Sequence, residues 1–190
     1  MNIPTQKECY RLIREMGMLD HIVVHSEQVC RVAVLLTDHL NRKGFDLDMD
    51  LITAAALLHD ITKTRSFRTH ENHAQTGGAF LEQKGFVEVG RIVAQHVKLD
   101  AYFSSDKPIE AEIVNYSDKR VLHDQIVSLS DRMNYILDRY GNEKENRERI
   151  LMLWAKTEQL EKKLFSFLPF SPESLKNRCR PQKHPDGQHP

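Results

Sequence analysis

The chain has 190 residues, of which 40% are apolar, so its size and composition suit one domain with a substantial core. Lysine plus arginine and aspartate plus glutamate both number 27, which makes the formal net charge zero. No overall field therefore directs the molecule to a nucleic acid polymer or to an acidic membrane surface.

Two further features bear on where the protein works. No run of about 18 apolar residues is present to span a bilayer, and the N-terminal stretch, with Lys7, Glu8 and Arg11, lacks the apolar segment of a secretory signal. The three cysteines are odd in number and far apart, which suits neither a disulfide framework nor a zinc ribbon. We expect a cytoplasmic protein with reduced, mostly structural thiols and no membrane partner.

Helical periodicity organises the chain from residue 20 onward. Between residues 20 and 40, apolar residues recur at helical spacing among charged ones, which predicts an amphipathic helix. Residues 51–58 are apolar nearly all round and follow Asp48 and Asp50, which suit a helix N-terminus, so a buried central helix is expected there. Further helices are predicted over residues 71–84, 87–97 and 108–122. Almost nothing reads as strand, so we expect an all-α fold.

The C-terminal part divides in two. After Gly141, a charged run opens a long helix whose apolar stripe, including Ile150, Trp154 and Leu160, predicts that it covers the bundle. From Ser171 to Pro190, prolines alternate with polar and basic residues, and too little apolar surface is present to offset the entropy of ordering. We therefore predict one domain over residues 1–170 and a flexible polar tail over 171–190.

Three polar residues lie on faces that should be buried. His25 shares its helical stripe with apolar residues, and His59 and Asp60 end the apolar central helix. A buried imidazole needs a partner, and an unpaired buried carboxylate costs several kcal/mol or more. A divalent cation would hold Asp60 ionised and take neutral His59 as a second ligand. The alternative is an internal ion pair of Asp60 with Lys63 or Arg65, which leaves the histidines unexplained.

Three more candidate ligands follow on other predicted helices: His73, His96 and Asp118. With His25, His59 and Asp60 they supply four imidazoles and two carboxylates. This mixed nitrogen and oxygen set suits Mn, Fe or Zn more than Mg alone. The set is large enough to hold two ions.

In their order along the chain, these residues resemble the HD domain superfamily, in the variety with an HDIGK motif followed by HAxxGA. The matching segments are His25-Ser26, His59-Asp60-Ile61-Thr62-Lys63, His73-Ala74-Gln75-Thr76-Gly77-Gly78, Gln95-His96 and Tyr116-Ser117-Asp118-Lys119. The resemblance covers roughly residues 15 to 140. Thr62 stands where the family usually has glycine, and Gly78 where it usually has alanine.

The resemblance implies an HD-type helical bundle and a metal-dependent phosphohydrolase. It implies that His25, His59, Asp60 and Asp118 bind a first ion, that His73 and His96 complete a second site, and that Asp60 bridges the two. Mn or Fe would be the expected ions, with Mg, Zn, Co or Ni as further candidates. Bound ions would lower the pKa of a shared water, whose hydroxide attacks phosphorus in line, with Asp60 as the catalytic carboxylate. Lys63 is the first candidate to neutralise the phosphate, with Lys119, Arg120, Arg65 and Lys98 behind it.

Substrate and alternatives follow from the family as well. The implied substrate is a small phosphorylated molecule, with a nucleotide as the leading class and no nucleic acid polymer. The alternatives are a di-iron oxygenase of the same fold and a non-catalytic HD module for sensing or protein contact. His70 is the main rival of His73 as a ligand, but His73 alone stands in the Ala-x-x-Gly context. We expect His123-Asp124, a second His-Asp pair, to cap or link helices.

Overall fold

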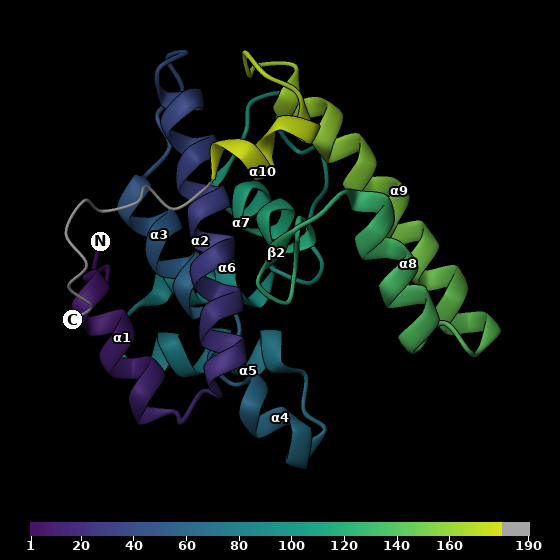
Figure 1. The fold of residues 1–190 in the computed structure, drawn as a ribbon. Coiled ribbons are helices and arrows are strands. Elements are labelled where there is room, and N and C mark those ends of the chain that lie inside the picture. Colours follow the sequence, from purple (N-terminus) through teal and green to yellow (C-terminus); the bar gives the residue numbers. More distant parts are fainter. Residues whose placement is uncertain (180–190) are drawn as a thin grey trace.

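A computed structural model of the chain describes residues 1–179; residues 180–190 of the predicted tail lie outside the described residues. The described part is built mainly of helices (Figure 1). The helical elements in chain order are α1 (Gln6–Glu15), α2 (Asp20–Asn41), α3 (Met49–Leu58), α4 (Lys63–Thr69), α5 (His73–Gln83), α6 (Val87–Ala94), α7 (Glu110–Lys119), α8 (Leu129–Tyr140), α9 (Lys144–Phe165), the 3-10 helix η1 (Pro172–Ser174) and α10 (Leu175–Arg178). Strands β1 (Val121–Leu122) and β2 (Gln125–Ile126) form a short antiparallel hairpin. The predicted all-α class is confirmed.

Helix α3 is the buried centre of the bundle. It packs against α1, α2, α6 and α7, and its Ile52, Ala55, Ala56 and Leu58 side chains are fully buried. The alanines keep the helix thin, so neighbouring helices can approach it closely. The prediction of a buried central helix is confirmed, and Asp48 caps it by accepting a hydrogen bond from the Leu51 amide at 2.9 Å.

Helices α5 and α6 cross in direct backbone contact. A Cβ atom on Gly78 would lie 2.7 Å from the carbonyl oxygen of Gly90, and one on Gly90 would lie 2.6 Å from the carbonyl oxygen of Gly78. This contact is the physical reason for glycine at position 78, where the family usually has alanine. The crossing sets the start of α5 beside the end of α6, and therefore His73 near His96.

Several element boundaries differ from their predictions. Helix α5 begins at His73 because the Asn72 side chain accepts hydrogen bonds from the next amides, and α7 begins at Glu110 and ends before the β-hairpin. Helices α1, α4 and α8 were not predicted, although Thr5 and Glu8 form a capping box that marks the start of α1 in the sequence.

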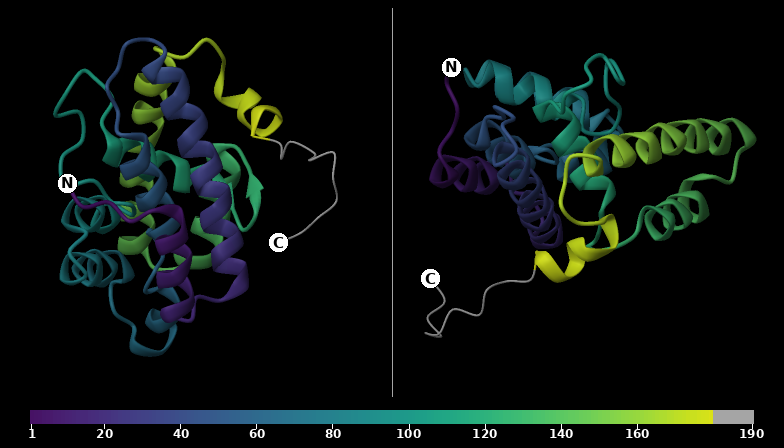
Figure 2. Two further views of the ribbon diagram at one scale, coloured as in Figure 1. Left: turned by 90° about the vertical axis from the view of Figure 1, so that its left-hand side faces the viewer. Right: turned by 90° about the horizontal axis from the view of Figure 1, so that it is seen from above.

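Helix α9 covers the bundle only with its C-terminal half. Thr157, Leu160 and Leu164 are buried, and this half packs on α7. The N-terminal half pairs with α8 in a helical hairpin that projects from the other helices, seen from above in Figure 2. The predicted long helix is therefore present, but part of it serves as an arm.

The segment predicted as a flexible tail is packed over residues 171–179. Leu175 is fully buried, the Arg120 guanidinium donates to the Pro172 carbonyl oxygen at 3.0 Å, and Cys179 lies against α2 with its sulfur 4.0 Å from the Arg31 carbonyl oxygen. Composition misled the prediction here, because one leucine and one buried guanidinium are enough to hold a short segment. Within the described residues, no helix has the length and apolar character required to cross a membrane.

Candidate metal centre

The six predicted ligands converge on one region from separate elements. They are His25 in α2, His59 at the end of α3, Asp60 in the following turn, His73 at the start of α5, His96 shortly after α6, and Asp118 near the end of α7. All are buried except His73, which is partly exposed. The bundle therefore places six polar side chains together in its interior, next to a cleft.

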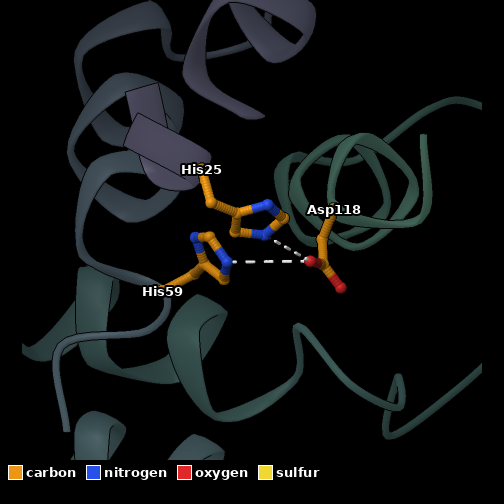
Figure 3. A group of neighbouring side chains, drawn as sticks. All are labelled: His25, His59 and Asp118. Carbon is orange, nitrogen blue, oxygen red and sulfur yellow. Dashed lines mark hydrogen bonds and ion pairs between the residues drawn. The ribbon is translucent and has the colours of Figure 1, made fainter. Parts of the chain in front are cut away.

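Half of this cluster consists of His25, His59 and Asp118. Figure 3 shows both imidazoles pointing toward the Asp118 carboxylate. The Asp118 Oδ1 atom lies 3.2 Å from His25 Nε2 and 3.7 Å from His59 Nε2. Ligand atoms of the three residues all lie within 4.8 Å of one another, which is close enough for one cation to contact all of them.

The other half is arranged around Asp60. Its Oδ2 atom is 3.4 Å from His59 Nε2, and its Oδ1 atom is 3.3 Å from His73 Nε2 and 3.5 Å from His96 Nε2. The two Nε2 atoms of His73 and His96 are 3.2 Å apart. Asp60 thus contacts His59 through one carboxylate oxygen and His73 and His96 through the other, so it stands between the two halves.

Backbone carbonyls fix the orientation of three imidazoles. The Nδ1 atoms of His25, His59 and His96 lie 2.9, 2.8 and 2.7 Å from the carbonyl oxygens of His123, Ala56 and Val93. A carbonyl can only accept, so each Nδ1 carries the proton, and in the neutral ring the Nε2 lone pair faces the carboxylates. This is the arrangement that metal-binding histidines require.

The β-hairpin has a role in this orientation. His123 adopts a left-handed conformation, with φ of 56°, in the turn between β1 and β2, and its carbonyl oxygen accepts from His25. The second His-Asp pair therefore links elements, and its backbone positions a candidate ligand.

Two buried atoms of the cluster have no hydrogen-bond partner among residues 1–179: His59 Nε2 and Asp60 Oδ1. A buried polar atom left unpaired costs free energy, and a lone pair facing a carboxylate oxygen adds repulsion. A divalent cation between them would satisfy both atoms. The residues present therefore fit a metal centre.

The protonation states also favour metal binding. Burial raises the pKa of Asp60, but His59 and Lys63 outweigh it and hold the pKa well below its usual range. Burial likewise raises the pKa of Asp118, and its neighbours, led by Lys119, outweigh it. Burial lowers the pKa of His96 to about 4, so its ring is neutral at physiological pH. Ionised carboxylates and a neutral imidazole are the ligand forms that a metal needs.

His59 carries the opposite shift. Burial lowers its pKa, but the attraction of Asp60 and Asp118 outweighs burial and raises the pKa overall. A cation bound between the carboxylates would take the place of that proton.

The predicted basic residues lie in different places. Lys63 forms an ion pair with Asp60 Oδ2 at 2.9 Å, which is the pair expected if Asp60 bound no metal. This pair leaves the other carboxylate oxygen, Asp60 Oδ1, without a hydrogen-bond partner in the described part of the chain. Lys119 pairs with Asp118 Oδ2 at 2.9 Å, and Lys98 lines the cleft. Two others point elsewhere: Arg65 pairs with Glu71 at 2.6 Å, and Arg120 with Glu161 at 2.9 Å.

Two further positions near the candidate ligands are Thr62, where the family motif has glycine, and His70. Thr62 donates to the carbonyl oxygen of His73 at 2.8 Å, so the threonine that replaces glycine anchors the first turn of α5. His70, the rival of His73, ends α4 in a left-handed conformation. Neither histidine is in the two groups whose ligand atoms all lie within 4.8 Å, but His73 Nε2 lies 3.3 Å from Asp60 Oδ1.

The cluster lies at one side of a cleft of about 1060 Å³. The α8–α9 hairpin lines the other side with residues that include Arg132, Tyr135 and Trp154. The sequence did not predict this side of the cleft, because α8 was not expected and Trp154 was assigned to the face of α9 that covers the bundle. The spacing of Arg132, Tyr135 and Arg139 on one helical face was the available signal.

Comparison with known proteins identifies the class. The family model described as "HD domain" matches residues 22–154, and the chain belongs to the HD domain family. The family and the histidine and aspartate clusters together support a metal-dependent HD hydrolase.

Among curated proteins, the chain is 29% identical over 153 residues to a tRNA (cytidine(56)-2'-O)-methyltransferase of Picrophilus torridus, covering 74% of this chain and 42% of that one. It is 32% identical over 96 residues to the protein of the same name from Thermoplasma volcanium, covering 50% and 26%. It is 25% identical over 149 residues to an uncharacterized protein of Methanocaldococcus jannaschii, covering 70% and 86%. The chain thus spans less than half the length of either methyltransferase.

Among solved structures, a "predicted HD superfamily hydrolase" from an uncultured Thermotogales bacterium is 18% identical, with a TM-score of 0.48 over 87% of this chain and 94% of that one.

Proposed function

We propose that the protein is a metal-dependent phosphohydrolase that cleaves a phosphate ester or anhydride of a small molecule, with a nucleotide as the substrate class. The observation that carries the proposal is the pair of unpartnered buried atoms, His59 Nε2 and Asp60 Oδ1, inside a cluster of six ligands beside a cleft. We propose two ions for each chain, Mn or Fe. The three free cysteines favour a reducing compartment such as the cytoplasm.

The residues of the site would have different roles in this reaction. Ions bound by the cluster would supply Lewis acidity and lower the pKa of a water molecule. His25, His59, Asp60, His73, His96 and Asp118 would hold those ions. Lys63 lies at the cleft with its ammonium on Asp60, from where it can turn to a phosphate oxygen and neutralise its charge. Asp60, whose low pKa keeps it ionised, would bridge the ions and orient the attacking water.

The test is metal content together with phosphate release. We expect His59→Ala and Asp60→Ala each to lose bound metal and at least about a hundredfold of activity while the helices stay formed, since each change removes a candidate metal ligand. His70→Ala is the matched control, because His70 is an exposed histidine close in sequence to the cluster, and it should be silent. Elemental analysis, circular dichroism and a panel of phosphate esters and nucleotides measure the three quantities.

Two results would overturn the proposal. One is full metal stoichiometry in His59→Ala or Asp60→Ala. The other is a metal-loaded protein that releases phosphate from no member of the panel; oxygen consumption by an iron-loaded protein would then support the di-iron oxygenase instead.

A further inference from the structure

The cleft is larger than a phosphate group needs. Its volume of about 1060 Å³ is at the upper end of what small-molecule sites occupy. Five of the six candidate metal ligands, all but His59, line one side of it. The opposite side is the α8–α9 hairpin, which projects from the bundle (Figure 2) and contributes about a third of the lining residues.

Arg132, on α8, is a cationic side chain with no ion pair to a carboxylate in the described part of the chain. Its Nε atom is buried and has no hydrogen-bond partner, and its guanidinium forms no ion pair within the described part of the chain. Its contact is with a ring, since the guanidinium carbon lies 5.9 Å from the centroid of Tyr135. The charge of Arg132 also acts on Asp118 and Lys63, where it lowers both pKa values as a minor contributor behind burial and nearer charges. Arg132 therefore lines the same cleft as the candidate metal ligands Asp60 and Asp118, and within the described part of the chain it lacks an anionic partner.

Trp154, on α9, has a second unpaired donor. The residue is 5% exposed, and its indole Nε1 is buried with no hydrogen-bond partner among the residues that the structure describes. A buried tryptophan N–H usually finds an acceptor. Both Arg132 and Trp154 line the cleft and both can only donate, so an oxygen-rich ligand fits both.

The charge of the cleft extends beyond the candidate metal ligands. Its lining contains six cationic side chains: Lys63, Lys98, Lys119, Arg132, Arg139 and Arg149. The lining carboxylates are Asp60, Asp100 and Asp118, two of which belong to the ligand cluster. Divalent ions would add to this positive charge, and all three arginines of the lining lie on the hairpin rather than in the ligand cluster. The hairpin also lines the cleft with apolar and aromatic side chains, which include Tyr135, Ile136, Ile150 and Leu153.

We propose that the α8–α9 hairpin forms a second subsite that recognises a nucleoside carrying at least two phosphates. Arg132 binds a phosphate other than the one at the metal centre, Trp154 donates its indole N–H to an oxygen of the same ligand, and the Tyr135 ring packs against its organic part. This subsite names the substrate class of the cleft and so rests on the proposed function. Its residues are outside the ligand cluster, so binding at the hairpin can be measured apart from hydrolysis.

Trp154 itself reports on the subsite, because it is the single tryptophan of the chain. The metal-loaded protein is titrated with α,β-methylene-ADP and with the methylenephosphonate analogue of AMP, which stand for ADP and AMP because their phosphorus–carbon bonds resist hydrolysis, following tryptophan fluorescence and binding heat. We expect the fluorescence to change on binding, and ADP to bind at least about tenfold more tightly than AMP, the range for one additional charge-assisted contact.

Three variants locate the effect. Arg132→Gln should abolish the preference for ADP and leave the affinity for AMP within about twofold. Trp154→Phe keeps the apolar bulk and removes the donor, so calorimetry should show an affinity for both nucleotides about fivefold to tenfold weaker. Arg147→Gln removes an exposed charge from α9 outside the cleft and should change neither affinity. Melting temperatures check that all three variants are folded.

The subsite is wrong if ADP and AMP bind equally, or if Arg132→Gln behaves like Arg147→Gln. Binding of an RNA oligonucleotide with a terminal phosphate, with no binding of ADP, would also overturn it and assign the hairpin to a polymer. These outcomes are distinct from failure of the proposed function, in which ADP binds with the expected preference but no phosphate is released.

Discussion

At the scale of single residues, two departures from the family motif have local physical causes. Thr62 replaces a glycine and uses its hydroxyl to hold the carbonyl of His73, the first residue of α5. Gly78 replaces an alanine because the backbone of α6 passes too near for a Cβ atom. Neither change alters a candidate ligand, so all six candidate ligands of the motif are still present.

Gly78→Ala restores the residue that the family usually has at this position. Alanine should add up to about 1 kcal/mol of helix propensity, but the clash with the Gly90 carbonyl should cost about 1–3 kcal/mol. We expect a net loss of stability and a melting temperature lower by several degrees. Gln83→Ala, on an exposed position of the same helix, is the control and should change little. A more stable Gly78→Ala protein would show that α5 and α6 can separate without cost.

At the scale of elements, α10 packs on the bundle although its sequence is mostly polar. Leu175 is fully buried, and η1 supplies a carbonyl to Arg120, whose guanidinium also binds Val127 and Glu161. A short segment can therefore dock when it fills one apolar site and completes the hydrogen bonds of a buried cation.

Leu175→Ala tests that docking. Removing a fully buried leucine side chain should cost about 2–5 kcal/mol and lower the melting temperature by several degrees or more. Deleting residues 180–190, whose composition offers little to bury, should leave the melting temperature close to that of the full chain. Differential scanning calorimetry on both proteins decides the matter, and an unchanged Leu175→Ala protein would contradict the docked arrangement.

At the scale of the whole molecule, the candidate metal centre joins α2, α3, α5 and α7 with the segments that follow α3 and α6. Ions held there would cross-link elements far apart in the sequence. Metal binding should therefore stabilise the fold, by about 2.7 kcal/mol when the free ion is at a hundred times its dissociation constant.

We expect chelation to lower the melting temperature and Mn²⁺ to restore it. His73→Ala should lose about one ion of two and keep part of this gain in stability, because the His25, His59 and Asp118 group is untouched.

The gain in stability on metal binding should also grow with pH. In the chelated protein the raised pKa of His59 adds stability at low pH that is lost as pH rises through that pKa, and metal must displace the same proton. Calorimetry between pH 6 and 8 measures both trends; a metal-independent melting temperature, or binding of one ion only, would refute the two-ion centre.

The sequence by itself determined the features that depend on local pattern. Helical periodicity identified α2, α3 and α9, and the HD motifs supplied the ligand types from His25 to Asp118. Only the tertiary structure decided which atoms meet, because these contacts join distant residues: His25 and Asp118 are 93 positions apart, and Arg132 and Trp154 meet the cleft from the two sides of a hairpin. Arg120 illustrates the difference, since it follows the motif that contains Asp118 but its side chain points to Glu161 and η1. A sequence pattern states which side chains one element can bury; the partners that satisfy them depend on how the elements pack.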